Sequence, residues 1–197
     1  MAQMIISVGR EFGSGGRVIA EELAKRFNIP IYDRHLITEI AEKTDLSPEE
    51  VEKYNEAPKM KIFSRRVNGF SNSIEDNIAE MQFNFIDEKA KSGESFVVVG
   101  RCAETKLRKY PELISLFVLG DMDEKIKRVM KIYEVSEDEA RDLIIKKDKK
   151  RKRYHNYHCS GHWGDSRLYD LSVNSSRLGI EKTIDVLEKY ILARISK

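Results

Sequence analysis

The sequence contains few cysteines and no long apolar segment. Its two cysteines, Cys102 and Cys159, lie far apart and do not form the disulfide framework of a small secreted domain. No apolar run approaches the roughly 20 residues that a membrane-spanning helix requires. Met1 to Met4 lack the basic and apolar regions of a secretory signal. We therefore expect a cytoplasmic protein that has no membrane partner.

A strong excess of charge of one sign is also absent. The chain has 35 basic and 33 acidic residues and a formal net charge of +2, which is not the balance of a protein built to coat nucleic acid. Hydrophobic residues make up 41% of the sequence, enough for the core of a single domain spanning residues 1–197. The basic residues are unevenly spread, because seven of them fall between Lys146 and Arg153 with one acid, Asp148.

Short apolar runs alternate with helical patterns along the chain. The runs that predict buried strands are Met4–Val8, Ser95–Val99, Ile114–Leu119 and Leu168–Val173. Capping patterns at Ser47 and Ser136 predict helix starts, and apolar residues from Ile180 to Ile191 share one face of a last helix. Residues 52–78 are polar and are expected to be irregular rather than part of a sheet. We predict an α/β fold with a parallel sheet between layers of helices, whose ligands bind beyond the carboxyl ends of the strands.

A glycine-rich segment, Gly13-Ser14-Gly15-Gly16, lies between the first predicted strand and a helix. Glycines let backbone N–H groups turn toward an anion, and the helix N-terminus adds partial positive charge. A P-loop has Lys and then Ser or Thr after its second glycine, whereas Gly16, Arg17 and Val18 occupy this stretch. The segment predicts phosphate binding with Arg17 as the cation. A glycine-rich turn without a ligand is the alternative.

From this loop onward the sequence resembles the cytidylate kinase-like branch of the P-loop nucleoside monophosphate kinases. The parts that carry the resemblance are, in order, Ile6–Arg17, Ile29–Ile37, Gly100–Ala103, Arg128, then Asp148, Arg151 and Arg153, then Tyr169–Ser175 and Leu178–Glu181. The family's acceptor-side Asp-Ser pair reads Asp33-Arg34 here. The resemblance implies a three-layer P-loop NTPase fold with a mobile lid at about 146–166 and an acceptor-side helical insertion at about 45–92.

The activity that the resemblance implies is phosphoryl transfer from ATP, with Mg²⁺, to a nucleoside monophosphate, CMP or dCMP, giving CDP or dCDP. The implied ATP-binding residues are Gly9, Gly13, Ser14, Gly15, Gly16, Arg17 and Val18. The implied acceptor-binding residues are Asp33, Arg34, Arg101 and Asp148. Arginines neutralise the transferred group as bidentate, permanently charged donors. The expected catalytic residues are Arg17, Arg101, Arg151 and Arg153.

Other functions stay open. A nucleotide-binding regulatory protein with lost or weak kinase activity would show no turnover, and a kinase of another small acceptor would share every feature named above. The basic run leads into the aromatic segment Tyr154–Asp165, a composition that also suits stacking on single-stranded nucleic acid. We favour a lid, because no other basic stripe continues this patch. Small-molecule nucleotides are the expected partners.

Several residues also have a purely structural interpretation. Asp33 can be a helix N-cap, Arg101 can pair with an acid, and Arg128 can be a solvated surface residue. A possible Zn²⁺-binding group comprises His155, His158, Cys159 and His162. It lacks the paired Cys-x-x-Cys spacing of a zinc ribbon, and we interpret its members as polar lid residues. We therefore assign no metal ligands from the sequence.

Overall fold

The computed structural model describes residues 3–33, 47, 66–67, 70–71 and 74–196. Within these residues the chain forms a sheet of five parallel strands in the order β2-β5-β1-β6-β7. The strands are β1 (Ile5–Arg10), β2 (Ile31–Tyr32), β5 (Phe96–Val99), β6 (Leu113–Leu119) and β7 (Leu171–Asn174). Because all five run in one direction, their carboxyl ends meet at one edge of the sheet.

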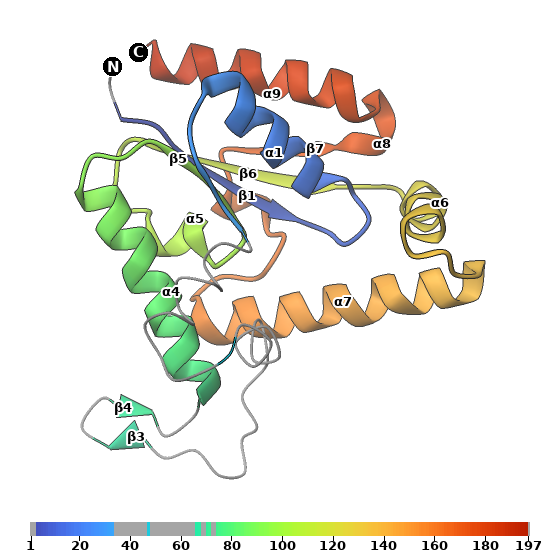
Figure 1. The fold of residues 1–197 in the computed structure, drawn as a ribbon, viewed down its shortest axis with the longest axis horizontal. Coiled ribbons are helices and arrows are strands. Elements are labelled where there is room, and N and C mark those ends of the chain that lie inside the picture. Colours follow the sequence, from blue (N-terminus) through green and yellow to red (C-terminus); the bar gives the residue numbers. More distant parts are fainter. Residues whose placement is uncertain (1–2, 34–46, 48–65, 68–69, 72–73, 197) are drawn as a thin grey trace.

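Helices cover both faces of this sheet (Figure 1). The longer helices are α1 (Gly16–Phe27), α4 (Ile74–Lys91), α6 (Met122–Tyr133), α7 (Glu137–His158) and α9 (Ile180–Ile195), and the one-turn helices are α5 (Ala103–Lys106) and α8 (Ser175–Leu178). Ile6 and Val8 of β1 join a core with α1 and α9, whereas Ile5 joins a core with α4 and α5. Successive side chains of a strand point to opposite faces. The predicted three-layer arrangement is confirmed.

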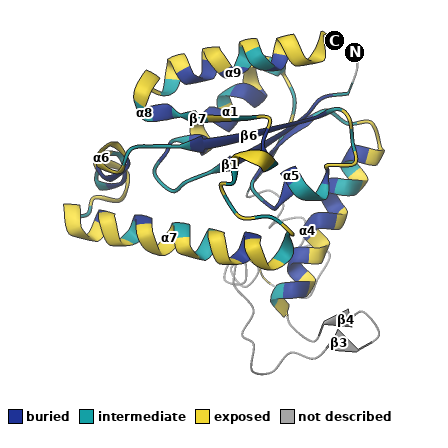
Figure 2. Cartoon of the chain, turned by 180° about the vertical axis from the view of Figure 1, so that it is seen from behind, coloured by how far each residue is buried: buried dark blue, intermediate teal, exposed yellow. Residues whose placement is uncertain are grey.

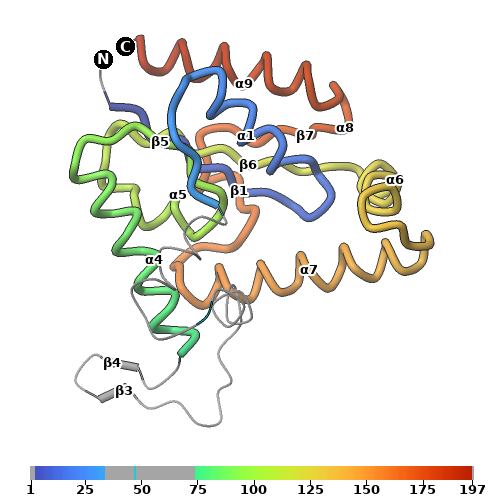
Figure 3. The backbone as a smooth tube through the Cα atoms, viewed as in Figure 1, coloured from blue at the N-terminus to red at the C-terminus, as the bar shows by residue number. Residues whose placement is uncertain are grey.

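Beyond β6 the chain leaves the sheet, forms α6 beside it and returns along α7 (Figure 3). Helix α7 begins as predicted at Ser136, whose hydroxyl accepts a hydrogen bond from Glu139 N–H while the Glu139 carboxylate accepts from Ser136 N–H. The outer side of α7 is exposed along its length (Figure 2). The helix continues unbroken for 22 residues. The segment expected to be a lid, about 146–166, therefore starts inside a continuous helix.

The last strand differs from its prediction. Leu168 ends a single 3₁₀ turn (Ser166–Leu168), and β7 begins only at Leu171. Asp165 caps that turn by accepting a hydrogen bond from Arg167 N–H, which satisfies the local backbone without a strand partner. The apolar run thus begins before the strand does.

The segment expected to be irregular also contains regular structure. Strands β3 (Arg66–Val67) and β4 (Phe70–Ser71) pair antiparallel, and α4 begins at Ile74. The residues that follow the predicted cap Ser47, and the predicted site residue Arg34, lie outside the described residues. None of the helices in the described part of the chain is long and apolar enough to cross a membrane.

Candidate functional site

The glycine-rich segment forms a tight loop between β1 and α1. Gly13 and Gly15 have left-handed backbone conformations, with φ of 82° and 80°, which a residue with a Cβ adopts only with strain. The fully buried Ser14 hydroxyl donates a hydrogen bond to the Glu11 carbonyl and accepts one from Gly16 N–H. Ser14 therefore fixes the shape of the loop, and its hydroxyl does not face outward.

The start of α1 has the properties of an anion site. Its N-cap, Gly15, makes no side-chain hydrogen bond, and its first turn contains no acidic residue. The first N–H groups of a helix need an acceptor, and the helix dipole favours negative charge at this end. Val18 would contribute only its backbone, because its side chain is 51% exposed. This loop and helix start can therefore accept an anionic group.

Arg17, the predicted cation, lies on the first turn of α1 with a half-exposed side chain. Its Nε lies 2.9 Å from Glu21 Oε1 on the same helix and 3.1 Å from Asp33 Oδ2, which directly follows β2. Two residues that the sequence assigns to the site, Arg17 and Asp33, are therefore in contact. The sequence assigns Arg17 to the ATP site and Asp33 to the acceptor site.

A second arginine reaches the loop from the end of β1. A Cβ placed on Gly16 would lie 2.5 Å from Arg10 Cβ, and a Cβ on Gly100, just after β5, would collide with the Arg10 guanidinium. Counting from Gly15 as the last glycine of the P-loop pattern, Gly16 stands where that pattern has lysine. The Arg10 side chain thus fills the space that a lysine side chain would need, and it brings a guanidinium of its own.

A buried lysine joins the loop to α7. Lys125 of α6 is 4% exposed, and its Nζ lies 3.0 Å from Glu11 Oε2 and 3.2 Å from Asp148 Oδ2. The Asp148 carboxylate also accepts a 2.6 Å hydrogen bond from Phe12 N–H. Burial raises the pKa of Asp148, although these donors oppose the shift. Asp148 therefore lies against the glycine loop.

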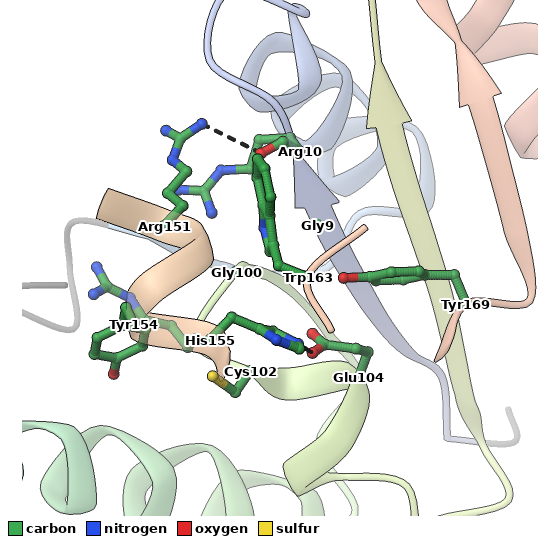
Figure 4. A pocket seen from close by; sticks show the side chains of 11 residues that line it. Gly9, Arg10, Gly100, Cys102, Glu104, Arg151, Tyr154, His155, Trp163 and Tyr169 are labelled. Atoms are coloured by element: carbon green, nitrogen blue, oxygen red, sulfur yellow. Dashed lines mark hydrogen bonds and ion pairs between the residues drawn. The ribbon is translucent and has the colours of Figure 1, made fainter. Parts of the chain in front are cut away.

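A small pocket, with a cavity volume of about 20 Å³, opens where β1 and β5 end (Figure 4). Three of the residues that line it are the arginines Arg10, Arg101 and Arg151. Trp163 and Tyr169 add aromatic surface to the pocket, and both rings pack against the same neighbour, Phe117. The pocket thus combines cationic and aromatic groups at the edge of the sheet that also holds the loop.

The predicted arginines occupy different surroundings. Arg101 follows β5 with φ of 62° and a buried side chain, whose Nη1 donates to Gln82 Oε1 at 3.2 Å and whose Nη2 lies 3.5 Å from Asp33 O. Arg151 donates to the Arg10 carbonyl at 3.3 Å. Arg153 is exposed on α7 and does not line this pocket. Arg128, from α6, donates a hydrogen bond to the Gly13 carbonyl.

A group that we call the cysteine–histidine cluster comprises Cys102, Glu104, His155 and Cys159. The first three are buried and line the pocket, and Cys159 lies partly buried beside them. His155 Nε2 lies 2.7 Å from Glu104 Oε1. Burial alone would lower the pKa of His155, but hydrogen bonds to Cys159 and Glu104 raise it to about 10. Hydrogen bonding from the Cys102 thiol lowers the pKa of the Cys159 thiol.

The structure divides the four residues that the sequence grouped as a possible zinc set. His155 and Cys159 come together in the cluster, whereas the His158 ring packs against the rings of Phe83, Tyr154 and Tyr157. His162 is exposed. Sequence reasoning missed Glu104, which stands three residues after the predicted Arg101, and it missed Arg10 and Lys125, whose roles depend on contacts between distant parts of the chain.

Comparison with known proteins places these features in context. The model of the cytidylate kinase-like family matches residues 5–177. A crystal structure of an uncharacterized protein from Eubacterium ventriosum has 40% sequence identity and a TM-score of 0.76, and the match covers 96% of this chain and 98% of that one. The comparison with curated proteins gives no match.

More distant solved structures share the fold. A shikimate kinase from Bacteroides thetaiotaomicron has 18% identity and a TM-score of 0.56, over 96% of this chain and 99% of that one. A gluconokinase from Sinorhizobium meliloti has 15% identity and a TM-score of 0.53, over 98% and 91%. With the parallel sheet and the glycine loop, these likenesses identify the fold of the P-loop kinases.

Proposed function

The chain belongs to the cytidylate kinase-like family, and on this premise we propose that it transfers the γ-phosphoryl group of ATP to a nucleoside monophosphate. CMP and dCMP are the proposed acceptors, and CDP and dCDP the products. The observation that carries the proposal is the position of Arg10. Its side chain lies against the glycine loop at Gly16 and also lines the arginine pocket at the strand ends.

Phosphoryl transfer needs two reactants held in line and the charge on the transferred group neutralised. The loop and the start of α1 would hold the β- and γ-phosphates of ATP, because the first turn of α1 has neither a side-chain N-cap nor an acidic residue. Arg10 would neutralise charge between the two reactants. Arg101 and Arg151, on the other sides of the pocket, would bind the acceptor phosphate. Arg17 and Arg153 remain proposed contributors.

Mg²⁺ would enter with the nucleotide and neutralise its β- and γ-phosphate oxygens. The buried Ser14 hydroxyl is committed to the loop, so a carboxylate is the better protein ligand. Asp33 offers one next to Arg17, with its side chain 15% exposed. A single carboxylate is consistent with the way Mg²⁺ retains waters and phosphate oxygens.

The acceptor is tested directly by measuring ATP-dependent product formation with a panel of nucleoside monophosphates and small hydroxyl acceptors. We expect turnover with CMP or dCMP. Arg151→Ala should weaken binding of the acceptor phosphate and reduce the rate, by up to about 10³-fold, the scale for an arginine that neutralises the transferred group. Arg141→Ala is the matched control, because Arg141 lies on the same helix, 44% exposed and paired with Glu137, and it should leave the rate unchanged.

The other functions give different results in the same experiment. ATP binding without turnover on any acceptor would support a regulatory protein and reject the kinase proposal. Turnover confined to a non-nucleotide acceptor would keep the kinase but reject CMP. Oligonucleotide binding that weakens steeply with salt, and that is lost with the exposed Lys146, Lys147 and Lys149, would indicate a nucleic-acid surface on α7.

A further inference from the structure

The phosphoryl transfer proposed above gives the cysteine–histidine cluster no role, although Cys102, Glu104 and His155 line the same pocket as its arginines. One donor atom each from Glu104, His155 and Cys159 lies within 4.8 Å of the other two. The buried Cys102 packs against the partly buried Cys159. The four donors come from two helix ends, since Cys102 is the N-cap of α5 and Cys159 is the C-cap of α7.

The spacing of the donors favours a common ligand. His155 and Cys159 are four residues apart at the end of α7, so they lie on one side of that helix. Cys102 is the N-cap of α5, and Glu104 of α5 faces His155 in the pocket (Figure 4). The cluster therefore offers two sulfur atoms, one imidazole nitrogen and one carboxylate oxygen from two rigid elements.

This donor set is chemically selective. Thiolate and imidazole ligands favour zinc, whereas Mg²⁺ and Ca²⁺ prefer oxygen donors. Zinc binds sulfur at about 2.3 Å and nitrogen at about 2.0 Å in a tetrahedron, which requires neighbouring donor atoms roughly 3.5 Å apart. The donor atoms of Glu104, His155 and Cys159, already within 4.8 Å of one another, reach that spacing by movements of about 1 Å, which side-chain rotation supplies. Cys102, which packs against Cys159, would turn toward them as the fourth ligand.

We propose a zinc site at the floor of the pocket, whose four ligands are Cys102, Glu104, His155 and Cys159. Zinc would take the place of the thiol protons and of the proton between His155 and Glu104, and these protons would leave to solvent. Two thiolates and one carboxylate carry more negative charge than the ion carries positive charge. The buried Arg101, next to Cys102 in the chain, provides a positive charge in the same region. Cys102, Glu104 and His155 line the pocket, which gives the ion an entry path.

The site is tested first on the unaltered full chain, purified without an affinity histidine tag and kept reduced. After chelation, the protein is titrated with Zn²⁺ in competition with a chromophoric chelator, and in parallel with Co²⁺. We expect one Zn²⁺ bound per chain and, with Co²⁺, the charge-transfer absorption of a thiolate-bound ion. Zn²⁺ should also raise the melting temperature. None of these measurements needs turnover, so the proposal stands or falls independently of the kinase activity.

Variants identify the ligands. Cys159→Ser and His155→Gln should abolish stoichiometric Zn²⁺ binding. His162→Gln is the matched control, because His162 is an exposed histidine outside the cluster, and it should bind Zn²⁺ as the unaltered chain does. Circular dichroism of the metal-free variants shows whether lost binding reflects lost ligands or lost fold, and the Co²⁺ spectrum of the unaltered chain does not depend on any variant.

Three results would overturn the proposal. One is a folded, reduced chain that takes up no stoichiometric Zn²⁺. Another is a Cys159→Ser variant that binds Zn²⁺ as tightly as the unaltered chain. The third is a Co²⁺ complex without thiolate absorption. Loss of two titratable thiols on treatment with a disulfide oxidant, in a chain that takes up no metal, would instead identify Cys102 and Cys159 as a dithiol pair.

Discussion

The Arg10 side chain occupies the space into which a side chain at Gly16 would have to extend, with the two Cβ positions 2.5 Å apart. The absence of a P-loop lysine is therefore coupled to the presence of this arginine. One structural element excludes the other, and the guanidinium that lies against Gly16 comes from β1.

Restoring the lysine should be harmful. Gly16→Lys is expected to destabilise the chain by about 1–3 kcal/mol through overpacking against Arg10, and to lower nucleotide binding as the loop shifts. The same lysine placed in an Arg10→Ala chain should be tolerated better. Denaturant unfolding of the two single variants and the double variant measures the coupling. Additive effects would contradict the steric relationship.

Lys125 should be more important for stability than its neighbour on α6. Lys125→Met removes the cation between Glu11 and Asp148 and is expected to cost about 3 kcal/mol, the scale for breaking a buried ion pair. Lys127→Met is the control, because Lys127 is 71% exposed and pairs only along the helix with Glu124. Its cost should stay below about 0.5 kcal/mol. Urea unfolding compares the two variants, and equal costs would reject a special role for Lys125.

Gly15 should tolerate a methyl group less well than another glycine with the same backbone conformation. Gly15 and Gly93 both have φ of 80°, but a Cβ on Gly15 would collide with Ile180 at the start of α9, whereas a Cβ on Gly93 meets nothing within 4 Å. Gly93→Ala should cost about 1 kcal/mol from backbone strain alone. Gly15→Ala should cost a further amount of about 0.5–1.5 kcal/mol, because the terminal methyl of Ile180 has to leave its preferred rotamer. Matching unfolding free energies for the two variants would contradict this contact.

Acid should weaken the attachment of α4 to the segment after α5. Asp87 pairs with Lys91 at 2.8 Å and Lys109 at 2.6 Å, and it accepts a 2.9 Å hydrogen bond from the Tyr110 hydroxyl. Burial would raise the pKa of Asp87, but these donors lower it from 3.8 to about 2. Because the pKa of Asp87 is lower in the folded chain than in the unfolded chain, its ionised carboxylate stabilises the fold at any pH above the unfolded-state pKa. This contribution is lost as the pH falls from about 4 to about 2.

The measurement compares unfolding of the unaltered chain with that of Asp87→Asn across this pH range. The variant should be less stable near pH 7, and the difference should close toward pH 2, where the carboxyl of the unaltered chain becomes protonated. A difference that stays constant with pH would mean that charge on Asp87 contributes nothing to stability.

Local signals in the sequence predicted the parts of the fold that depend on neighbouring residues. The apolar runs at Ile5 and Phe96 became buried strands, and the Ser136 capping pattern became a helix start, because burial and capping are decided within a few residues. The strand predicted from Leu168 begins only at Leu171, because Asp165 accepts a hydrogen bond from Arg167 N–H and holds the preceding residues in a turn.

The site was harder to predict, because its contacts join distant segments. The sequence marks the glycine loop and Arg101, but it does not show that Arg10 rather than a lysine lies against Gly16. Nor does it show that Lys125 lies between Glu11 and Asp148, since three elements must pack before these charges meet. The cysteine–histidine cluster likewise requires the ends of α5 and α7 to be brought together.

One side of α7 carries Asp148 against the loop, Arg151 at the pocket, and His155 with Cys159 below it. A helix of 22 residues is about 33 Å long and moves nearly as a rigid rod. A displacement of Asp148 from Phe12 that carries α7 with it would therefore also move His155 and Cys159. If this movement changes the affinity of a ligand bound at the cluster, that ligand changes the affinity of the nucleotide by the same factor, because coupling between two binding sites is reciprocal.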